Sequence, residues 1–170
     1  MSDSLHSPTK NNYFLQSGFI FLPEQATDIS TVLGSCVAVC IYDKKRQKGG
    51  MNHFQLPSIY EPHKATARYG NIATLTLIHM LVHNGSKIKH LEAQIFWGAY
   101  NPRISRQNVG RDNIKIARKV LAKKRIRIAS EDVGGEKGRK IVFNTHSGEV
   151  AVLKVDKLRQ SDWHPYESNR

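Results

Sequence analysis

Short apolar stretches separated by turn residues dominate the chain, and this pattern is typical of β-strands. The stretch from Leu33 to Tyr42 is apolar on both of its alternating faces, so we expect it to lie centrally in a sheet. Residues 24–28 are expected to form a connecting loop. The other predicted strands are residues 18–22, a segment around 49–53, and residues 93–98, 126–132, 139–144 and 149–155.

Two segments carry apolar residues at three- and four-residue steps, which predicts amphipathic helices. The first runs from about Tyr69 to Leu81 and is followed by Asn84-Gly85, a common helix stop. The second runs from about Asn108 to Lys124. One face of this second helix is basic and carries Arg111, Lys115, Arg118, Lys119 and Lys123.

Two long helices among about seven strands, many of them linked as hairpins, predict an α+β fold. We expect a twisted, mostly antiparallel sheet layer with the two helices packed outside it. Residues 13–156 would form a single domain, because a chain of 170 residues is the size of one domain with a real core. Residues 1–12 are expected to be a mobile N-terminal arm, and residues 157–170 a polar C-terminal tail.

Composition narrows the class of protein and its compartment. The N-terminus is polar and lacks the apolar core of a signal peptide, and no apolar run approaches the roughly 20 residues that span a bilayer. Two cysteines cannot form a disulfide framework. We therefore expect a reduced, cytoplasmic protein. The excess of 26 Lys and Arg over 14 Asp and Glu gives a net charge of +12, which favours an acidic partner: nucleic acid, a membrane or an acidic protein.

The candidate chemistry lies around Cys36, where a glycine-containing turn enters an apolar strand. His53 follows seventeen positions later. If residues 43–48 form a hairpin turn, the two side chains become cross-strand neighbours, and a thiol needs such a base to act as a nucleophile. Gly34 and Ser35 make a flexible entry whose backbone N–H groups would stabilise an oxyanion. The alternative is that Cys36 is a small buried apolar side chain.

Other candidates are weaker. Cys40 lies about 13 Å from Cys36 on an extended strand, so the two sulfurs cannot form an unstrained disulfide, and Cys40 is expected to be core. His79 and His83 have zinc-ligand spacing on a helix, but no third ligand accompanies them. A solvated helix face is the expected role for that pair.

Four blocks of the sequence resemble the chemoreceptor glutamine deamidase family, CheD. They are Leu-Gly-Ser-Cys-Val-Ala-Val-Cys-Ile-Tyr-Asp at 33–43, Gly-Gly-Met-Asn-His-Phe-Gln-Leu-Pro at 49–57, Asn-Val-Gly-Arg-Asp-Asn at 108–113, and the segment 132–148. The likeness covers roughly residues 14–155. It implies an α/β sandwich, and an enzyme that hydrolyses selected glutamine side chains of methyl-accepting chemotaxis receptors to glutamate.

The resemblance also implies residue roles. Cys36 would be the nucleophile and His53 the base, and a hydroxyl residue five or six positions before the cysteine would orient the histidine. Both Ser30 and Thr31 qualify. Counting without a gap favours Ser30, whose even separation from Cys36 puts both on one face of an extended strand, and Thr31 stays open as the second candidate. The reaction passes through a thioester and needs no metal or cofactor.

One position departs from the family pattern. Trp97 stands in Phe-Trp-Gly-Ala at 96–99, where family members usually have Phe-Gly-Gly-Ala. The change bears on local substrate contacts or partner docking, and not on the Cys/His chemistry.

Two other functions remain as alternatives. The chain could act chiefly as a chemotaxis binding module, through the CheY-phosphatase partner CheC with which the family associates. It could also bind nucleic acid through the basic helix, although the chain carries no nucleic-acid-binding motif.

Overall fold

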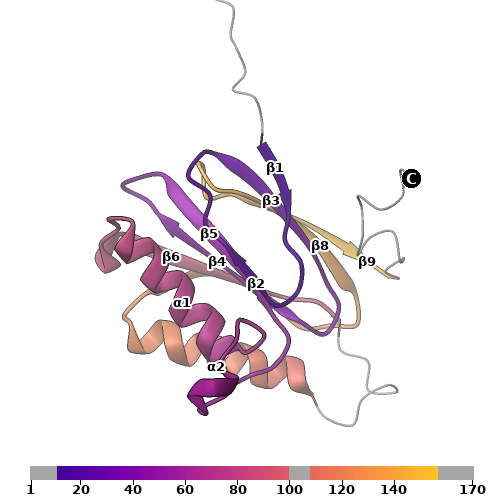
Figure 1. Ribbon diagram of the computed structural model, residues 1–170. Coiled ribbons are helices and arrows are strands. Elements are labelled where there is room, and N and C mark those ends of the chain that lie inside the picture. Colours follow the sequence, from indigo (N-terminus) through magenta and orange to yellow (C-terminus); the bar gives the residue numbers. More distant parts are fainter. Residues whose placement is uncertain (1–10, 100–107, 157–170) are drawn as a thin grey trace, which may run out of the picture.

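The computed structural model describes residues 11–99 and 108–156, which form three layers (Figure 1). Nine strands of this part of the chain make two sheets. The four-stranded sheet has the order β1 (Asn11–Phe14), β3 (Thr27–Leu33), β8 (Gly138–Asn144), β9 (Val150–Val155). The five-stranded sheet has the order β2 (Phe19–Phe21), β5 (Lys48–Phe54), β4 (Val37–Asp43), β6 (Leu91–Trp97), β7 (Arg127–Asp132).

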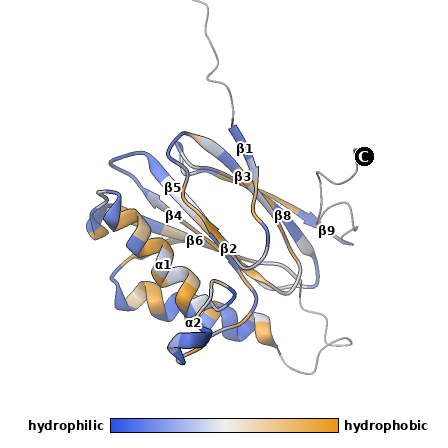
Figure 2. Ribbon diagram, viewed as in Figure 1, coloured by the Kyte–Doolittle hydropathy of each residue, from blue (hydrophilic) through white to orange (hydrophobic). Residues whose placement is uncertain are grey.

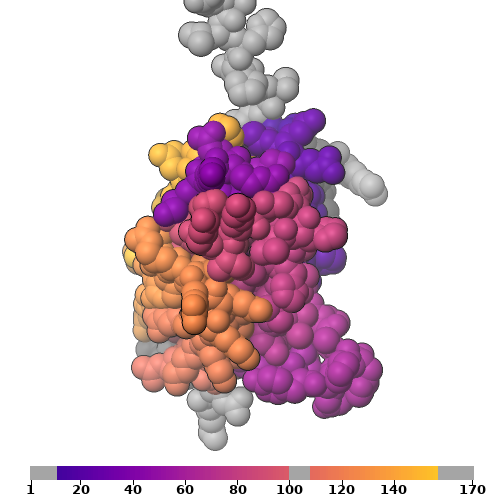
Figure 3. All heavy atoms as spheres, turned by 90° about the vertical axis from the view of Figure 1, so that its left-hand side faces the viewer, coloured from indigo at the N-terminus to yellow at the C-terminus, as the bar shows by residue number. Residues whose placement is uncertain are grey.

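Two α-helices, α1 (Gly70–His83) and α2 (Val109–Lys123), lie side by side on the outer face of the five-stranded sheet (Figures 1 and 3). Short 3₁₀ turns at Pro62–Lys64 and Ile88–His90 flank α1. The side chain of Asn108 caps α2 by accepting a hydrogen bond from the Arg111 N–H at 3.0 Å. No helix in the described residues has the length and apolarity needed to cross a membrane.

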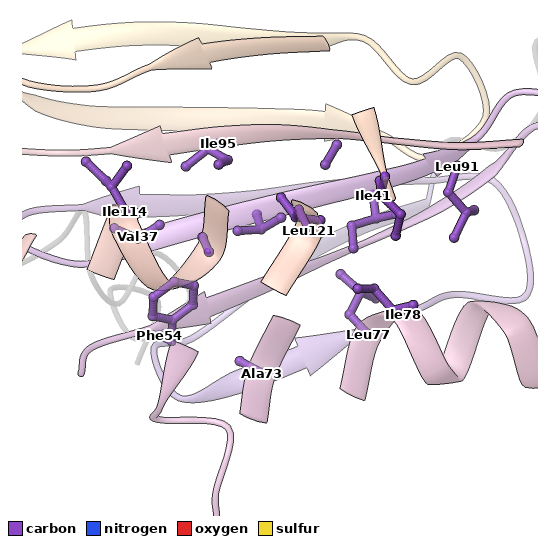
Figure 4. Packing of buried hydrophobic residues seen from close by; sticks show 14 of the residues in the cluster. Val37, Ile41, Phe54, Ala73, Leu77, Ile78, Leu91, Ile95, Ile114 and Leu121 are labelled. Carbon is purple, nitrogen blue, oxygen red and sulfur yellow. The ribbon is translucent and has the colours of Figure 1, made fainter. Parts of the chain in front are cut away.

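The apolar residues form two cores, one on each side of the five-stranded sheet. The helix-side core joins Val37, Ile41 and Ile95 of the sheet to Leu77 and Leu121 of the helices (Figure 4). The second core lies between the two sheets and contains Leu15, Ile29, Leu33, Ala38, Cys40, Tyr42, Met51, Phe96, Ile141 and Phe143. Strand β4 faces both cores, and Figure 2 shows that hydrophobic residues occur in the helices as well as in the strands of the sheets.

The predicted α+β sandwich is confirmed, and six of the nine described strands fall in predicted segments with small shifts of their ends. The single sheet layer and the continuous strand Leu33 to Tyr42 are wrong. Leu33 ends β3, and the turn at residues 34–36 carries the chain from one sheet to the other before β4 starts. The predicted loop at 24–28 is also shorter, since Thr27 begins β3.

The predicted N-terminal arm is described only in part, and the predicted C-terminal tail is not described. Residues 1–10 of the predicted arm and the predicted tail 157–170 lie outside the described residues. Asn11 and Asn12, the last two residues of the predicted arm, are part of β1 and pair with Thr27 and Asp28.

Trp97, the departure from the family pattern, belongs to the helix-side core and is 7% exposed. Its indole lies against Gly110 in the first turn of α2, where an added Cβ would come within 2.1 Å of the indole nitrogen. Gly110 leaves the space that the indole occupies. Trp97 therefore determines how α2 packs on the sheet.

Changing both members of this contact tests whether they depend on each other. Gly110→Ala should lower the free energy of unfolding by about 1 to 3 kcal/mol because its methyl group overpacks the indole. In a Trp97→Ala background the same change should no longer destabilise, since alanine favours helix over glycine by up to about 1 kcal/mol. Urea unfolding of the four proteins measures the coupling, and an equal cost of Gly110→Ala in both backgrounds would contradict it.

Candidate active site

Cys36 lies in the turn between β3 and β4, at the edge of the core between the sheets, and is half-buried. The end of β6 packs tightly on this turn. A Cβ on Gly98 would lie 2.1 Å from the carbonyl oxygens of both Leu33 and Gly34, and the Ala99 N–H donates to the Gly34 carbonyl at 2.6 Å. Only glycine allows this close approach, which fixes the backbone just before the thiol.

A buried arginine holds the other side of Gly98. Arg139 of β8 is 2% exposed, and its Nη1 donates to the Gly98 carbonyl at 2.7 Å. Its Nη2 donates to Asp132 Oδ1 at 3.0 Å and to the Gly134 carbonyl at 2.9 Å. The guanidinium thus joins β8, the end of β6 and the segment after β7. Buried arginines need such partners, because an unpaired charge in the interior is costly.

His53 lies in β5, is 1% exposed, and faces the core between the sheets with Met51 two residues before it. The hairpin turn at residues 43–48 is confirmed. The register pairs His53 with Ala38 of β4, so Cys36 is its diagonal neighbour rather than its direct partner. Ala38 and Cys36 both pack against the core between the sheets, which puts the thiol and the imidazole on the same face.

Thr31, and not Ser30, contacts His53. The Thr31 hydroxyl lies 2.8 Å from His53 Nδ1 and donates to the Leu15 carbonyl at 2.7 Å. A hydroxyl has one hydrogen, so toward the imidazole Thr31 accepts, and Nδ1 must carry the proton. The neutral ring then has its lone pair on Nε2, which makes no hydrogen bond within the described residues.

Strand parity explains why Ser30 lies elsewhere. Along β3, Ile29 and Leu33 face the other sheet, and Thr31 shares that face. Ser30 faces outward beside Val142, and its hydroxyl lies 3.5 Å from the Tyr13 carbonyl. The even count from Ser30 to Cys36 loses its meaning because the chain changes sheets between the two residues.

Burial keeps both reactive groups neutral. It lowers the pKa of His53 to about 4, against the opposing effect of the Leu15 carbonyl. Burial also raises the pKa of the Cys36 thiol, and a hydrogen bond with Ser17 works in the opposite direction. At neutral pH the resting pair is therefore a thiol beside an imidazole. Complete burial raises the pKa of Cys40 further, in keeping with its predicted place in the core.

The turn at Cys36 also supplies backbone donors. Outside the sheet ladders, and within residues 11–99 and 108–156, the N–H groups of Ser35 and Cys36 make no hydrogen bond. Ser35 is exposed, so this part of the turn lies at the protein surface.

A hollow of about 280 Å³ gives access to the histidine. It is lined by Phe14, Leu15, Gln16, Ser17, Thr31, Val32 and His53. Cys36 is not among the lining residues, but the Ser17 hydroxyl lies 4.0 Å from its sulfur. His53 and Ser17 therefore both form part of the wall of this hollow, and the sulfur lies next to the wall at Ser17.

Sequence reasoning missed the segment from Leu15 to Gly18, which links β1 to β2 across the site. Leu15 N–H donates to Ser30 of the four-stranded sheet, and Gly18 N–H donates to His53 of the five-stranded sheet. No motif marks this segment, because its role depends on which strands lie beside it. The sequence did contain a signal for Thr31: it alternates with Ile29 and Leu33, so it lies on the same, inward face of the strand.

The histidine pair on α1 lies on an exposed helix face, as expected. His79 and His83 are exposed, and the described residues hold no cluster of three or more His, Cys, Asp or Glu side chains suited to a metal ion.

The low pKa of His53 predicts acid sensitivity. A histidine whose pKa is about 4 when folded and 6.5 when unfolded stabilises the fold fully above 6.5, and this stabilisation is lost as the pH falls toward 4. Between about pH 7 and about pH 4.5, the wild type should lose about 2 to 3 kcal/mol more unfolding free energy than His53→Gln. Urea unfolding at the two pH values measures this difference, and parallel losses in both proteins would contradict it.

Comparisons with known proteins identify the family of this chain. A family model described as CheD chemotactic sensory transduction matches residues 55–154. Proteins named probable chemoreceptor glutamine deamidase CheD are similar over most of their length. The one from Sulfurimonas denitrificans is 41% identical over 147 residues, covering 85% of this chain and 94% of that protein. The one from Trichlorobacter lovleyi is 40% identical over 162 residues, covering 94% of this chain and 100% of that protein.

The matched family model starts two residues after His53, but an alignment over 94% of the chain necessarily includes residues 30–53. A third similar protein, named probable chemoreceptor glutamine deamidase CheD 1 from Anaeromyxobacter dehalogenans, is 39% identical over 144 residues, covering 84% of each chain. The likeness thus spans the candidate site and both layers of strands, and this chain belongs to the CheD family.

Proposed function

We propose that this protein is a chemoreceptor glutamine deamidase of bacterial chemotaxis, with Cys36 as the nucleophile and His53 as the base. The observation that carries the proposal is the ordered contact of Leu15 O, Thr31 Oγ1 and His53 Nδ1. This contact leaves the lone pair of Nε2 available on the face that His53 shares with Cys36. A buried, oriented imidazole beside a half-buried thiol is the arrangement that nucleophilic acyl chemistry needs.

In the first half of the reaction, His53 Nε2 takes the thiol proton as Cys36 Sγ attacks the side-chain amide carbon of a glutamine. The backbone N–H groups of Ser35 and Cys36 stabilise the oxyanion of the tetrahedral intermediate. The imidazolium then gives its proton to the departing amine. Ammonia leaves, and the glutamyl group stays on the sulfur as a thioester.

In the second half, water attacks the thioester carbon and His53 Nε2 takes a proton from it. The new tetrahedral intermediate collapses with cleavage of the carbon–sulfur bond. Cys36 leaves as a thiolate and recovers the proton from His53, while the substrate leaves as glutamate. The residue that orients the histidine is Thr31, because its hydroxyl fixes the tautomer that both halves require.

The charge of the protein suits such a substrate. A net charge of +12 attracts an acidic protein surface, and receptor signalling bundles of the kind that the family acts on are rich in glutamate. We place the reaction in the cytoplasm, where thiols stay reduced, and Cys36 and Cys40 are both free. A CheC-like phosphatase stays a predicted second partner.

Incubation with a receptor cytoplasmic fragment tests the proposed reaction. The wild type should release ammonia and raise the fragment mass by roughly one dalton per modified glutamine, as hydrolysis of an amide through a thioester requires. Cys36→Ala and His53→Ala should each lower the rate by at least about a thousandfold. Mass spectrometry of the fragment and an ammonia assay measure both effects.

Cys40→Ala is the matched control, since it removes the other thiol from the neighbouring core position. It should keep the wild-type rate. Full activity of Cys36→Ala would show that the nucleophile is another residue.

Comparison of the two hydroxyl residues of β3 tests the orienting role. Thr31→Ala should lower kcat/KM roughly tenfold to a hundredfold, because the imidazole loses the partner that fixes its tautomer. Thr31→Ser should keep most of the activity, and Ser30→Ala should stay near the wild type. A loss in Ser30→Ala that matches the loss in Thr31→Ala would contradict this assignment.

A further inference from the structure

A hydroxyl that the reaction described above does not use lies beside the reactive sulfur. Ser17 is in the segment that links β1 to β2, and its Oγ lies 4.0 Å from Cys36 Sγ. The residue is half-buried and lines the hollow that leads to His53. It thus stands at the point where substrate and thiol would meet.

Gln55 fixes the position of this hydroxyl. The register of β4 and β5 pairs Val37 with Phe54, so Gln55 is the next residue out on the side of Cys36. The Gln55 side-chain amide nitrogen donates to Ser17 Oγ at 2.6 Å. This bond is short, and it comes from the residue that directly follows β5, the strand of His53.

The orientation of the Gln55 amide follows from its other partner. Arg68 Nε lies 3.1 Å from Gln55 Oε1, and because arginine can only donate, the amide oxygen must face Arg68. The amide nitrogen therefore faces Ser17. The Gln55 backbone is held as well, since its N–H donates to the Arg68 carbonyl at 2.9 Å and its carbonyl accepts from Asn113 Nδ2 at 3.0 Å.

The direction of the next hydrogen bond follows. Ser17 Oγ already accepts from Gln55, so its one hydrogen remains available to donate. A thiolate at Cys36 has no hydrogen and can only accept. Once the sulfur carries charge, the hydrogen bond between the two residues therefore runs from Ser17 to Cys36.

We propose that Ser17 stabilises the Cys36 thiolate by a hydrogen bond, and that Gln55, held by Arg68, is the positioning residue that keeps the Ser17 hydroxyl in place. Ser17 touches the reacting sulfur, whereas Gln55 acts through Ser17. The inference rests on the proposed function, in which Cys36 is the nucleophile.

The stabilisation acts at two points of the reaction. It favours the charge on the sulfur as His53 Nε2 takes the thiol proton. It acts again when the second tetrahedral intermediate collapses, because the carbon–sulfur bond breaks with its electron pair on Cys36 and a stabilised thiolate is the better leaving group. Hydrogen bonds to charged groups are about twice as strong as neutral ones. Ser17 thus offsets part of the burial that disfavours the thiolate.

Alkylation of the full-length protein by iodoacetamide tests the proposal without a receptor. The rate of Cys36 modification is followed by peptide mass spectrometry between about pH 6 and about pH 10, because only the thiolate reacts. Ser17→Ala should slow alkylation at neutral pH about three- to tenfold and move the midpoint of the profile upward, as loss of a hydrogen bond to a charged group requires. Ser17→Thr, which keeps a hydroxyl, should restore most of the rate.

Gln55→Met keeps the size of the side chain and removes the amide donor. It should slow alkylation less than Ser17→Ala, since Ser17 is still present but no longer held. If Ser17→Ala fails to fold, as judged by urea unfolding, Gln55→Met carries the test alone: an unchanged alkylation profile overturns the proposal.

The chain offers a matched control pair in the same sheet. Ser130 of β7 donates to Gln94 Oε1 of β6 at 2.9 Å, and the Gln94 amide nitrogen donates to the Gly148 carbonyl at 2.8 Å, so this hydroxyl–amide contact is separate from the candidate site. Ser130→Ala and Gln94→Met should leave the alkylation profile of Cys36 unchanged. The proposal is overturned if the Ser17→Ala profile superimposes on the wild type, or if Ser130→Ala shifts it equally.

The same variants in the deamidation assay separate this proposal from the proposed function. Ser17→Ala should lower kcat/KM by the same factor that it lowers alkylation. If the wild type released no ammonia from a receptor fragment, the proposed function would fail while the alkylation results still decided the role of Ser17. If the wild type deamidated the fragment normally but Ser17→Ala had an unchanged alkylation profile, the proposed role of Ser17 would be rejected and the proposed function would stand.

Discussion

The hydrogen bond between Thr31 and His53 joins the two sheets at the place where chemistry would occur. Its two ends come from different sheets, so the 2.8 Å contact exists only when the sandwich is closed. The apolar side chains between the sheets hold that distance, with Ile29 and Leu33 on one side and Met51 on the other. Close packing of a protein interior leaves little freedom for such a contact to lengthen. The core between the sheets therefore sets the geometry of the base.

Burial makes His53 a weak base, with a pKa of about 4. Burial also raises the pKa of the Cys36 thiol, which therefore loses its proton less readily. The pair therefore rests uncharged, and in the proposed reaction proton transfer accompanies attack on the amide carbon. Groups that stabilise charge only when it forms, such as the N–H groups of Ser35 and Cys36, then contribute to the transition state and not to the resting enzyme.

Most of the fold followed from local signals in the sequence. Three- and four-residue periodicity located α1 and α2, and the basic turn at 43–48 located the hairpin that brings Cys36 and His53 to one face. The division into two sheets did not follow, because nothing local distinguishes a turn within a sheet from one that crosses between sheets. Because the change of sheet was not recognised, residue counting along one continuous strand favoured Ser30 over Thr31. Contacts of Ser17 and Leu15 depend on distant strands, so no spacing rule would have found them.

Arg139 connects parts of the molecule that the proposed catalytic residues do not contact. Through Gly98 it supports the turn before Cys36, and through the Gly134 carbonyl it holds the start of the segment that joins β7 to β8. Gly134 and Gly135 both have positive φ angles, and an added Cβ at either would meet no neighbouring atom within 4 Å. A protein or ligand that bound this segment and shifted its backbone would pull on the guanidinium. The thiol could thus respond to an event on a surface that contains no reactive group.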